Sequence, residues 1–240
     1  MKERGLICNQ RTVLAILAGA TQDRRPVKGV GLDNRIKWKG KIVCNVLDLE
    51  KSLDKSPFGV PGDRLYVRET MQCIREMETG GIYYDTIYSA NGEHFKGHER
   101  GEVQCDDWFE AYRDWWNAGK ESRFIPSIHM PRWASRINLL VKRVWVERVQ
   151  DISEADAIAE GIISDEDYHD NAGEENLFDC PSCQGLQVHG AFGESYGVIE
   201  VDCTVCDTVQ KRFSILMESI YGPGNPWVWA CEFEILSDNS

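Results

Sequence analysis

The alternation of apolar and polar residues along the chain predicts several strands. Residues 60–70, 137–149 and 227–235 alternate with the period of two that turns one face of a strand towards a core. Residues 82–93 predict a further strand that ends in an Asn-Gly turn. These segments are spread over most of the chain, so strands are expected to supply most of the core.

Apolar residues spaced three and four positions apart predict helices. One is expected over residues 11–19, followed by a basic turn at residues 24–25, and another over residues 211–222. A serine N-cap with Asp three residues later predicts a short helix over 153–161. We also expect a helix over residues 70–78. This order of elements favours an α+β fold, a small and mostly antiparallel β-barrel decorated with helices.

Charge is concentrated in one segment of the chain. The formal net charge is -12, yet residues 149–210 contain fifteen Asp and Glu and no Lys or Arg. The remainder has 27 basic against 24 acidic residues, so a surface outside that segment need not repel phosphate. No apolar stretch is long enough to cross a bilayer, and the apolar run near the N-terminus is too short for a secretory signal. We therefore expect a cytoplasmic protein.

Two closely spaced cysteine pairs give the most specific local signal. Cys180 and Cys183 form one CxxC and Cys203 and Cys206 another, with nineteen residues between the pairs. Four thiolates can complete a tetrahedral site that leaves no position open for substrate. We predict a structural zinc ion in a zinc ribbon inserted at 179–209, with redox or iron–sulfur roles as the alternatives.

Basic and aromatic residues suggest a binding pocket. The stretch that begins at Pro126 crowds a short turn with hydrogen-bond donors and one stacking surface. Arginines would hold a phosphate or a base edge, an aromatic ring would stack, and a histidine or glutamate would read polar groups. The residues of this predicted pocket are Arg25, Arg68, Glu69, His129, Arg132 and Trp133. Aromatic residues within 94–122 predict a helix that either packs on the core or stacks on bases.

Five motifs in order resemble a known family. They are LAILAGATQDRR, GDRLYVRET, PSIHMPRWASRI, QDISEADAIAEGI and MESIYGPGNPWVWACEFE. Together they make the chain similar to phage- or prophage-encoded members of the ASCH family, within the PUA-like superfamily. The resemblance implies a PUA-like barrel, formed by residues 1–178 and 210–240, whose cleft accepts nucleic acid or a nucleobase.

Some bacterial ASCH proteins are amidohydrolases that act on N4-acetylcytidine. Their motif is similar to ILAGRKTxTxR, and a Glu from the later helix acts with it; Glu160 matches that Glu, and Arg25 matches the Arg. This chain has no Lys after Gly19, and Asp23 stands where the second Thr would be. Arginine cannot replace a lysine that must lose a proton, because its pKa is too high. The resemblance thus implies Glu160 as the catalytic candidate, while the missing Lys argues against catalysis.

We therefore expect a protein that binds RNA or a modified nucleotide and contains a structural zinc site. One alternative is an amidohydrolase or ribonuclease that acts on a nucleoside or RNA substrate. A second alternative is a phage protein that binds a basic host protein through the acidic segment 151–179.

Overall fold

A computed structural model describes most of the chain, and its contacts divide into two compact units. The described residues are 1–30, 34–38, 41–78, 81–96, 124–165, 180–183, 188–192 and 198–237. The first unit consists of Met1–Leu17, Pro61–Lys142 and Phe233–Ser240, and the second of Ala18–Val60 and Arg143–Glu232. Residues 97–122 of the predicted aromatic helix and residues 166–179 of the acidic segment lie outside the described residues. The predicted boundaries of the barrel and the zinc ribbon stay a prediction.

The first unit contains two groups of paired strands. Its elements are β1 (Glu3–Ile7), α1 (Gln10–Leu17), β5 (Arg64–Arg68), β6 (Met71–Glu78), β7 (Gly81–Tyr88), β8 (His94–Lys96), η3 (Ser127–His129), η4 (Arg132–Ala134), the start of β9 (Asn138–Arg148) and the end of β12 (Trp227–Leu236). Strand order is β1-β5-β9 in one group and β6-β7-β8 in the other. Strand β1 runs parallel to β5, whereas β5 with β9, β6 with β7 and β7 with β8 are antiparallel. Leu65 and Val67 are buried on β5, as the alternation predicts.

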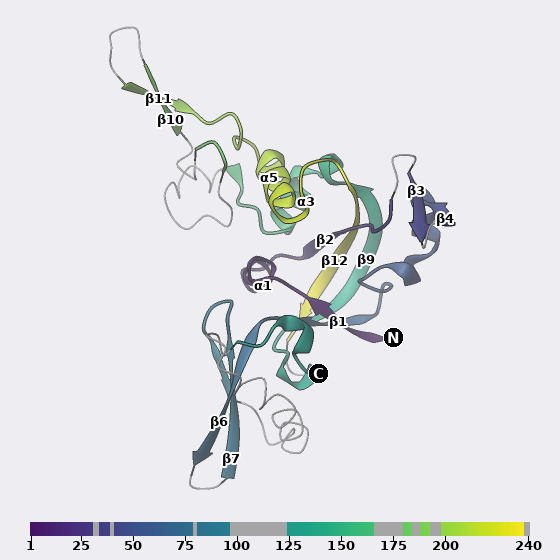
Figure 1. Ribbon diagram of the computed structural model, residues 1–240, viewed down its shortest axis with the longest axis vertical. Helices are drawn as coiled ribbons and strands as arrows, with labels where there is room; N and C mark the ends of the chain where they lie inside the picture. Colours follow the sequence, from purple (N-terminus) through teal and green to yellow (C-terminus); the bar gives the residue numbers. More distant parts are fainter. Residues whose placement is uncertain are drawn as a thin grey trace. The chain divides into compact units, whose positions relative to one another are not determined.

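The helix predicted over residues 70–78 is wrong, because this segment is strand β6. It pairs antiparallel with β7 from Met71 opposite Tyr88 to Glu78 opposite Gly81, and the two form a long hairpin (Figure 1). The neighbouring strand satisfies the backbone groups that a helix would satisfy internally. The hydrogen bonds between β6 and β7 outweigh the weak helical preference of this segment.

The second unit combines a sheet with two packed helices. Its elements are β2 (Gln22–Pro26), β3 (Arg35–Trp38), β4 (Lys41–Asn45), η1 (Val46–Lys51), η2 (Leu53–Lys55), the remainder of β9, η5 (Val149–Asp151), α3 (Glu154–Ala159), β10 (Val188–Phe192), β11 (Val198–Asp202), α5 (Val209–Tyr221) and the start of β12. Strand order is β9-β12-β2, with β12 antiparallel to β2. The basic turn predicted at residues 24–25 is therefore wrong, since both residues belong to β2.

Helices α3 and α5 confirm the two later helix predictions. The Ser153 side chain accepts a hydrogen bond from the Asp156 amide and so caps α3. Thr208 caps α5 in the same way, and Gly222 follows that helix with a φ of 86°. The two helices pack together (Figure 1) around a buried cluster that includes Phe213.

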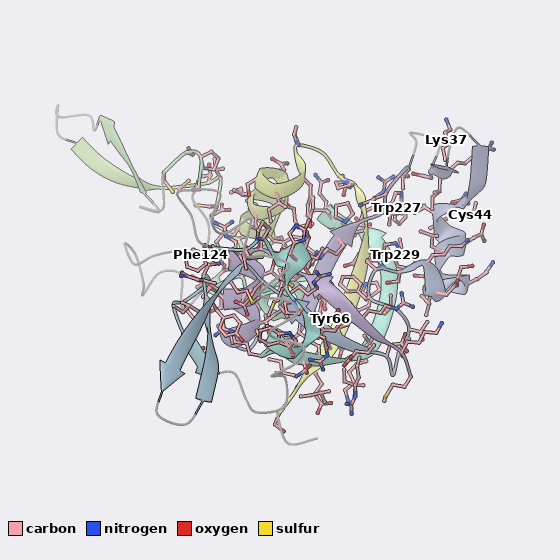
Figure 2. The ribbon with its side chains drawn as sticks, turned by 60° about the horizontal axis from the view of Figure 1, so that its bottom comes forward. Lys37, Cys44, Tyr66, Phe124, Trp227 and Trp229 are labelled. Carbon is pink, nitrogen blue, oxygen red and sulfur yellow. The ribbon has the colours of Figure 1, made fainter. Side chains whose placement is uncertain are left out.

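Strand β12 departs from the one-sided burial that its sequence predicts. Residues 228–231 are all buried, so both faces of the strand are covered there. Trp229 is 4% exposed, whereas Trp227 is only partly buried (Figure 2). The α+β class with a mostly sheet core is confirmed, and no closed barrel is found among the described strands. None of the described helices has the length and apolar character needed to cross a membrane.

Candidate functional site

A buried arginine organises a cluster of ionisable side chains in the second unit. The Arg24 side chain on β2 has no exposed surface. Its Nε donates to Glu147 Oε1 at 2.6 Å, and its Nη1 donates to Glu160 Oε1 at 2.8 Å and to Gln22 Oε1 at 2.9 Å. Burial alone would lower the pKa of Arg24, but the two carboxylates outweigh it and hold that pKa above its usual value. Arg24 therefore stays charged inside the protein.

Gln22 ties this cluster to helix α3. Its Nε2 donates to Asp156 Oδ1 at 2.8 Å while its Oε1 accepts from Arg24. Hydrogen bonds from Ser153 and Gln22 hold the pKa of Asp156 below its usual range. Thr21 adds a backbone bond from its N–H to the Ala159 carbonyl at 2.8 Å. These bonds place the C-terminal end of α3, and with it Glu160, beside β2.

Aromatic rings surround the guanidinium of Arg24. Its Cζ lies 5.5 Å from the centroid of the Trp145 ring and 5.9 Å from that of Phe213. Trp145 Nε1 donates to Glu147 Oε2 at 2.9 Å, so the indole also fixes the carboxylate that Arg24 binds. The cluster is thus rigid on its apolar side.

Asp23 and Arg25, the neighbours of Arg24 on β2, point to the opposite face of the strand. Arg25 Nε donates to Asp23 Oδ2 at 2.8 Å, and Asp23 is 5% exposed. Cys231 lies opposite Asp23 in the register of β2 and β12. Burial, with the nearby charges of Asp23 and Glu160, raises the pKa of the Cys231 thiol, so it remains protonated.

Glu160 is the group in this cluster that can change its protonation near neutral pH. Burial raises the pKa of Glu160 to about 8, the charge of Asp23 adds to the rise, and Arg24 opposes it. The physical reason is that an ionised Glu160 loses its hydration in this poorly solvated space and is repelled by Asp23, which together outweigh its attraction to Arg24 and Arg25.

The cluster is accessible at its carboxylates but not at its arginine. The Glu160 and Glu147 side chains are 10% and 18% exposed, whereas Arg24 is covered. Within the described part of the chain, no atom accepts a hydrogen bond from Arg24 Nη2. Because Arg24 is covered, an ordered water is the expected acceptor there. The exposed edges of Glu147 and Glu160 can bind a polar group, and Glu160 can exchange a proton with it.

The predicted pocket residues fall into both units. Arg25 and the catalytic candidate Glu160 belong to the second unit, and the other five residues belong to the first. Arg68 donates from Nη2 to the carbonyl of Ile128, and His129 is exposed at the end of η3.

The remaining three predicted residues are already engaged in packing or pairing. Arg132 donates to Glu3 at 2.8 Å and lies over the Tyr66 ring, with 5.0 Å from Cζ to the ring centroid. Trp133 packs against a buried cluster in the first unit. Both oxygens of Glu69 accept from Arg136, each at 2.9 Å. The nucleotide-binding roles of these residues remain a prediction.

Sequence reasoning missed Arg24, Glu147 and Trp145. It assigned the arginine of the motif to Arg25 from the alignment with the ASCH motif, and it expected residues 24–25 to form a turn. A strand over residues 22–26 separates the two, since neighbouring side chains point to opposite faces. The five-residue strand was the signal that could have identified Arg24.

Four cysteines form a separate candidate metal centre in the second unit. The sulfur atoms of Cys180, Cys183, Cys203 and Cys206 all lie within 4.8 Å of one another, and all four residues are buried. Sγ–Sγ distances of 3.8 Å (180 to 203) and 3.6 Å (183 to 206) exclude disulfide bonds, which measure about 2 Å. Strands β10 and β11 form the antiparallel hairpin expected between the pairs. The four thiols could hold one metal ion.

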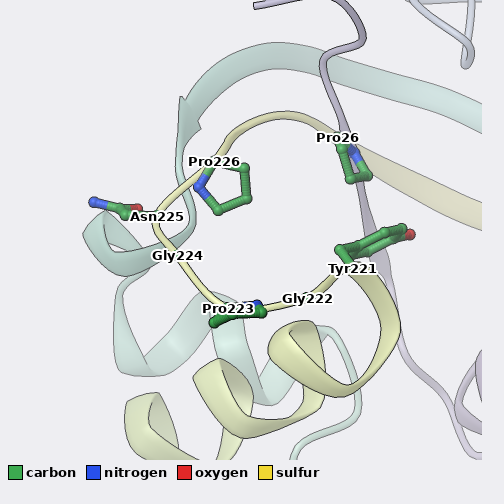
Figure 3. Close-up of a pocket in the computed structure, with 7 residues that line it drawn as sticks. All are labelled: Pro26, Tyr221, Gly222, Pro223, Gly224, Asn225 and Pro226. Carbon is green, nitrogen blue, oxygen red and sulfur yellow. The ribbon is translucent and has the colours of Figure 1, made fainter. Parts of the chain in front are cut away.

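An open hollow of about 400 Å³ lies elsewhere in the second unit. Its lining consists of Pro26 and residues 221–226, and Figure 3 shows the rings of Tyr221 and Pro226 beside it. None of the lining residues carries a charge at neutral pH.

Comparison of the chain with protein-family models, with curated proteins and with solved structures gives no match.

Proposed function

We propose that the protein binds a nucleotide or modified nucleoside at the cluster formed by Gln22, Arg24, Glu147 and Glu160. One observation supports this: Arg24 and Glu160, 136 residues apart, share a hydrogen bond in a partly exposed cluster. They come from the two segments, LAILAGATQDRR and QDISEADAIAEGI, that the resemblance to ASCH proteins associates with one site. The accompanying proposals are a PUA-like barrel and a phage or prophage origin.

The chemistry of the cluster suits a nucleobase edge. A carboxyl group that carries a proton both donates and accepts a hydrogen bond, and an ionised carboxylate beside it accepts only. Glu160 and Glu147 would supply these two patterns side by side. Trp145, fixed by its bond to Glu147, offers an indole surface on which a base could stack.

Binding of nucleosides tests this proposal, with Glu160→Ala as the variant and Glu154→Ala as its matched control. Glu154 lies on the same short helix, is exposed and makes no hydrogen bond within the described residues. Loss of a hydrogen bond to a buried carboxyl should weaken binding roughly ten- to a hundredfold. Calorimetric titration of the full chain measures it, with thermal unfolding as the check on folding. Equal affinities for the two variants would contradict the proposal.

Catalysis is the second candidate, favoured by the pKa of Glu160. A carboxyl with a pKa of about 8 can give and take a proton near neutral pH, as a general acid or base must. The lysine of the ASCH amidohydrolase motif has no counterpart in the cluster, where Arg24 stays protonated. Release of acetate from N4-acetylcytidine, lost in Glu160→Gln, would support hydrolysis. Binding without turnover would leave the protein as a binding module.

We also propose that the four cysteines hold a structural zinc ion. Zinc–thiolate bonds of about 2.3 Å in a tetrahedron place the sulfur atoms about 3.8 Å apart, close to the distances between these thiols. Bound zinc would hold the hairpin β10–β11 and the segment before α5 together. Metal analysis of the purified chain is expected to give one zinc ion per chain.

A further inference from the structure

Strand β9 carries one more charged residue on the face that forms the cluster. The buried positions of β9 are odd-numbered up to Val141 and even-numbered from Val144 onwards. After this change, Arg143, Trp145 and Glu147 occupy alternate positions and share one face. Glu147 and Trp145 contact Arg24, so the same face leads from the buried cluster to an exposed arginine.

Arg143 differs from the other arginines near the cluster in forming no side-chain ion pair within the described ranges. Its Cζ lies 4.7 Å from the centroid of the Trp145 ring, and its charge helps to lower the pKa of Asp156, whose oxygens accept hydrogen bonds from Ser153 and Gln22. Arg24 is held by Glu147 and Glu160, and Arg25 by Asp23. The stack on Trp145 restrains the guanidinium without using its N–H groups, which remain directed to whatever binds beside the indole.

We propose that Arg143 binds the phosphate of the ligand, so that the cluster takes a nucleotide rather than a neutral nucleoside. This inference rests on the proposed function, because it assumes that the base occupies the cluster. The planar fork of an arginine matches a phosphate bidentately. Since Arg143 is exposed, a phosphate can reach it without being buried.

The spacing along β9 fits a base, a stacking surface and a phosphate in sequence. Two residues along a strand cover about 6.6 Å and four cover about 13 Å. A base edge at Glu147 and Glu160 would therefore lie one strand step from the indole of Trp145 and a second step from Arg143. The acidic groups nearest this path are engaged: Asp156 accepts from Ser153 and Gln22. Arg143 is thus left to supply the positive charge at the outer end.

The experiment compares each of the four common ribonucleosides with its 5′-monophosphate by calorimetric titration of the full, zinc-containing chain. We expect the monophosphate of the preferred base to bind roughly tenfold more tightly than its nucleoside, as one exposed charge-assisted contact would give. Arg143→Gln should remove this preference, so that the nucleoside and its monophosphate bind this variant with equal affinity. Lys142→Gln is the control, because it removes the same charge from the adjacent exposed residue, which pairs with Glu234.

The possible results separate this inference from the proposed function. A preference for the monophosphate that disappears in Arg143→Gln, but persists in Lys142→Gln, supports the inference. Equal binding of nucleoside and monophosphate, or a preference that survives Arg143→Gln, overturns it while the proposed site stands. If no nucleoside or monophosphate binds, the proposed function fails, and the inference fails with it.

Discussion

The protonation of Glu160 should make the stability of this protein fall as the pH rises. Its pKa is raised from about 4.5 to about 8 by burial and by Asp23. Between these values the folded state holds a proton that the unfolded state has released. The stabilisation that the folded state gains from protonated Glu160 is fully present below about pH 4.5 and is lost as the pH rises through 8. The opposite trend, a gain with pH, is usual for a salt-bridged carboxylate.

The size of the expected loss of stability follows from the rise in the pKa of Glu160. Each pH unit inside the window can cost at most about 1.4 kcal/mol of unfolding free energy for one proton. The pKa of about 8 already includes the opposing attraction of Arg24, whose hydrogen bond to Glu160 measures 2.8 Å. We therefore expect a loss on the order of 3 kcal/mol between pH 5 and pH 8.

Glu160→Gln isolates this contribution. Glutamine resembles the protonated carboxyl in shape and can still accept from Arg24, but it does not titrate. Urea unfolding of both proteins at pH 5, 6, 7 and 8, with zinc in excess, gives the free energy of unfolding at each pH. The wild type should lose stability relative to Glu160→Gln at every step. A difference that is independent of pH, or that grows in favour of the wild type, would refute the reasoning.

Three further predictions concern other parts of the molecule. Cys206→Ser should abolish stoichiometric zinc binding, measured by elemental analysis, because a three-thiolate site lacks the fourth ligand; retained zinc would contradict it. Arg136→Gln should cost about 3 kcal/mol in urea unfolding, since it leaves Glu69 buried without its ion pair, whereas the exposed Arg132→Gln should cost less than about 1 kcal/mol; equal costs would be inconsistent with this. Gly5→Ala should destabilise by about 1–2 kcal/mol in the same assay, because its Cβ would lie 2.6 Å from Arg68 Cδ; an unchanged midpoint would show that Arg68 simply moves.

The sequence by itself determined the elements whose signals are local. Alternation located β5, the serine cap located the start of α3, and apolar residues at helical spacing located α5. The spacing of the two CxxC pairs identified the four thiols that come together. Each of these features depends on residues a few positions apart, or on a hairpin between them, so the pattern of neighbours is sufficient.

Only the tertiary structure decided which charged residues are buried and with what partner. Glu147 and Glu160 bind Arg24 across 123 and 136 residues, and Glu69 binds Arg136 across 67. Choosing Arg24 over Arg25 required knowing that residues 22–26 form a strand, whose neighbouring side chains point to opposite faces. The segment of β6 became a strand because β7 pairs with it. The physical reason is that burial makes an unpaired charge or backbone group costly, and the partner that removes this cost can come from anywhere in the chain. Local periodicity carries no information about that partner.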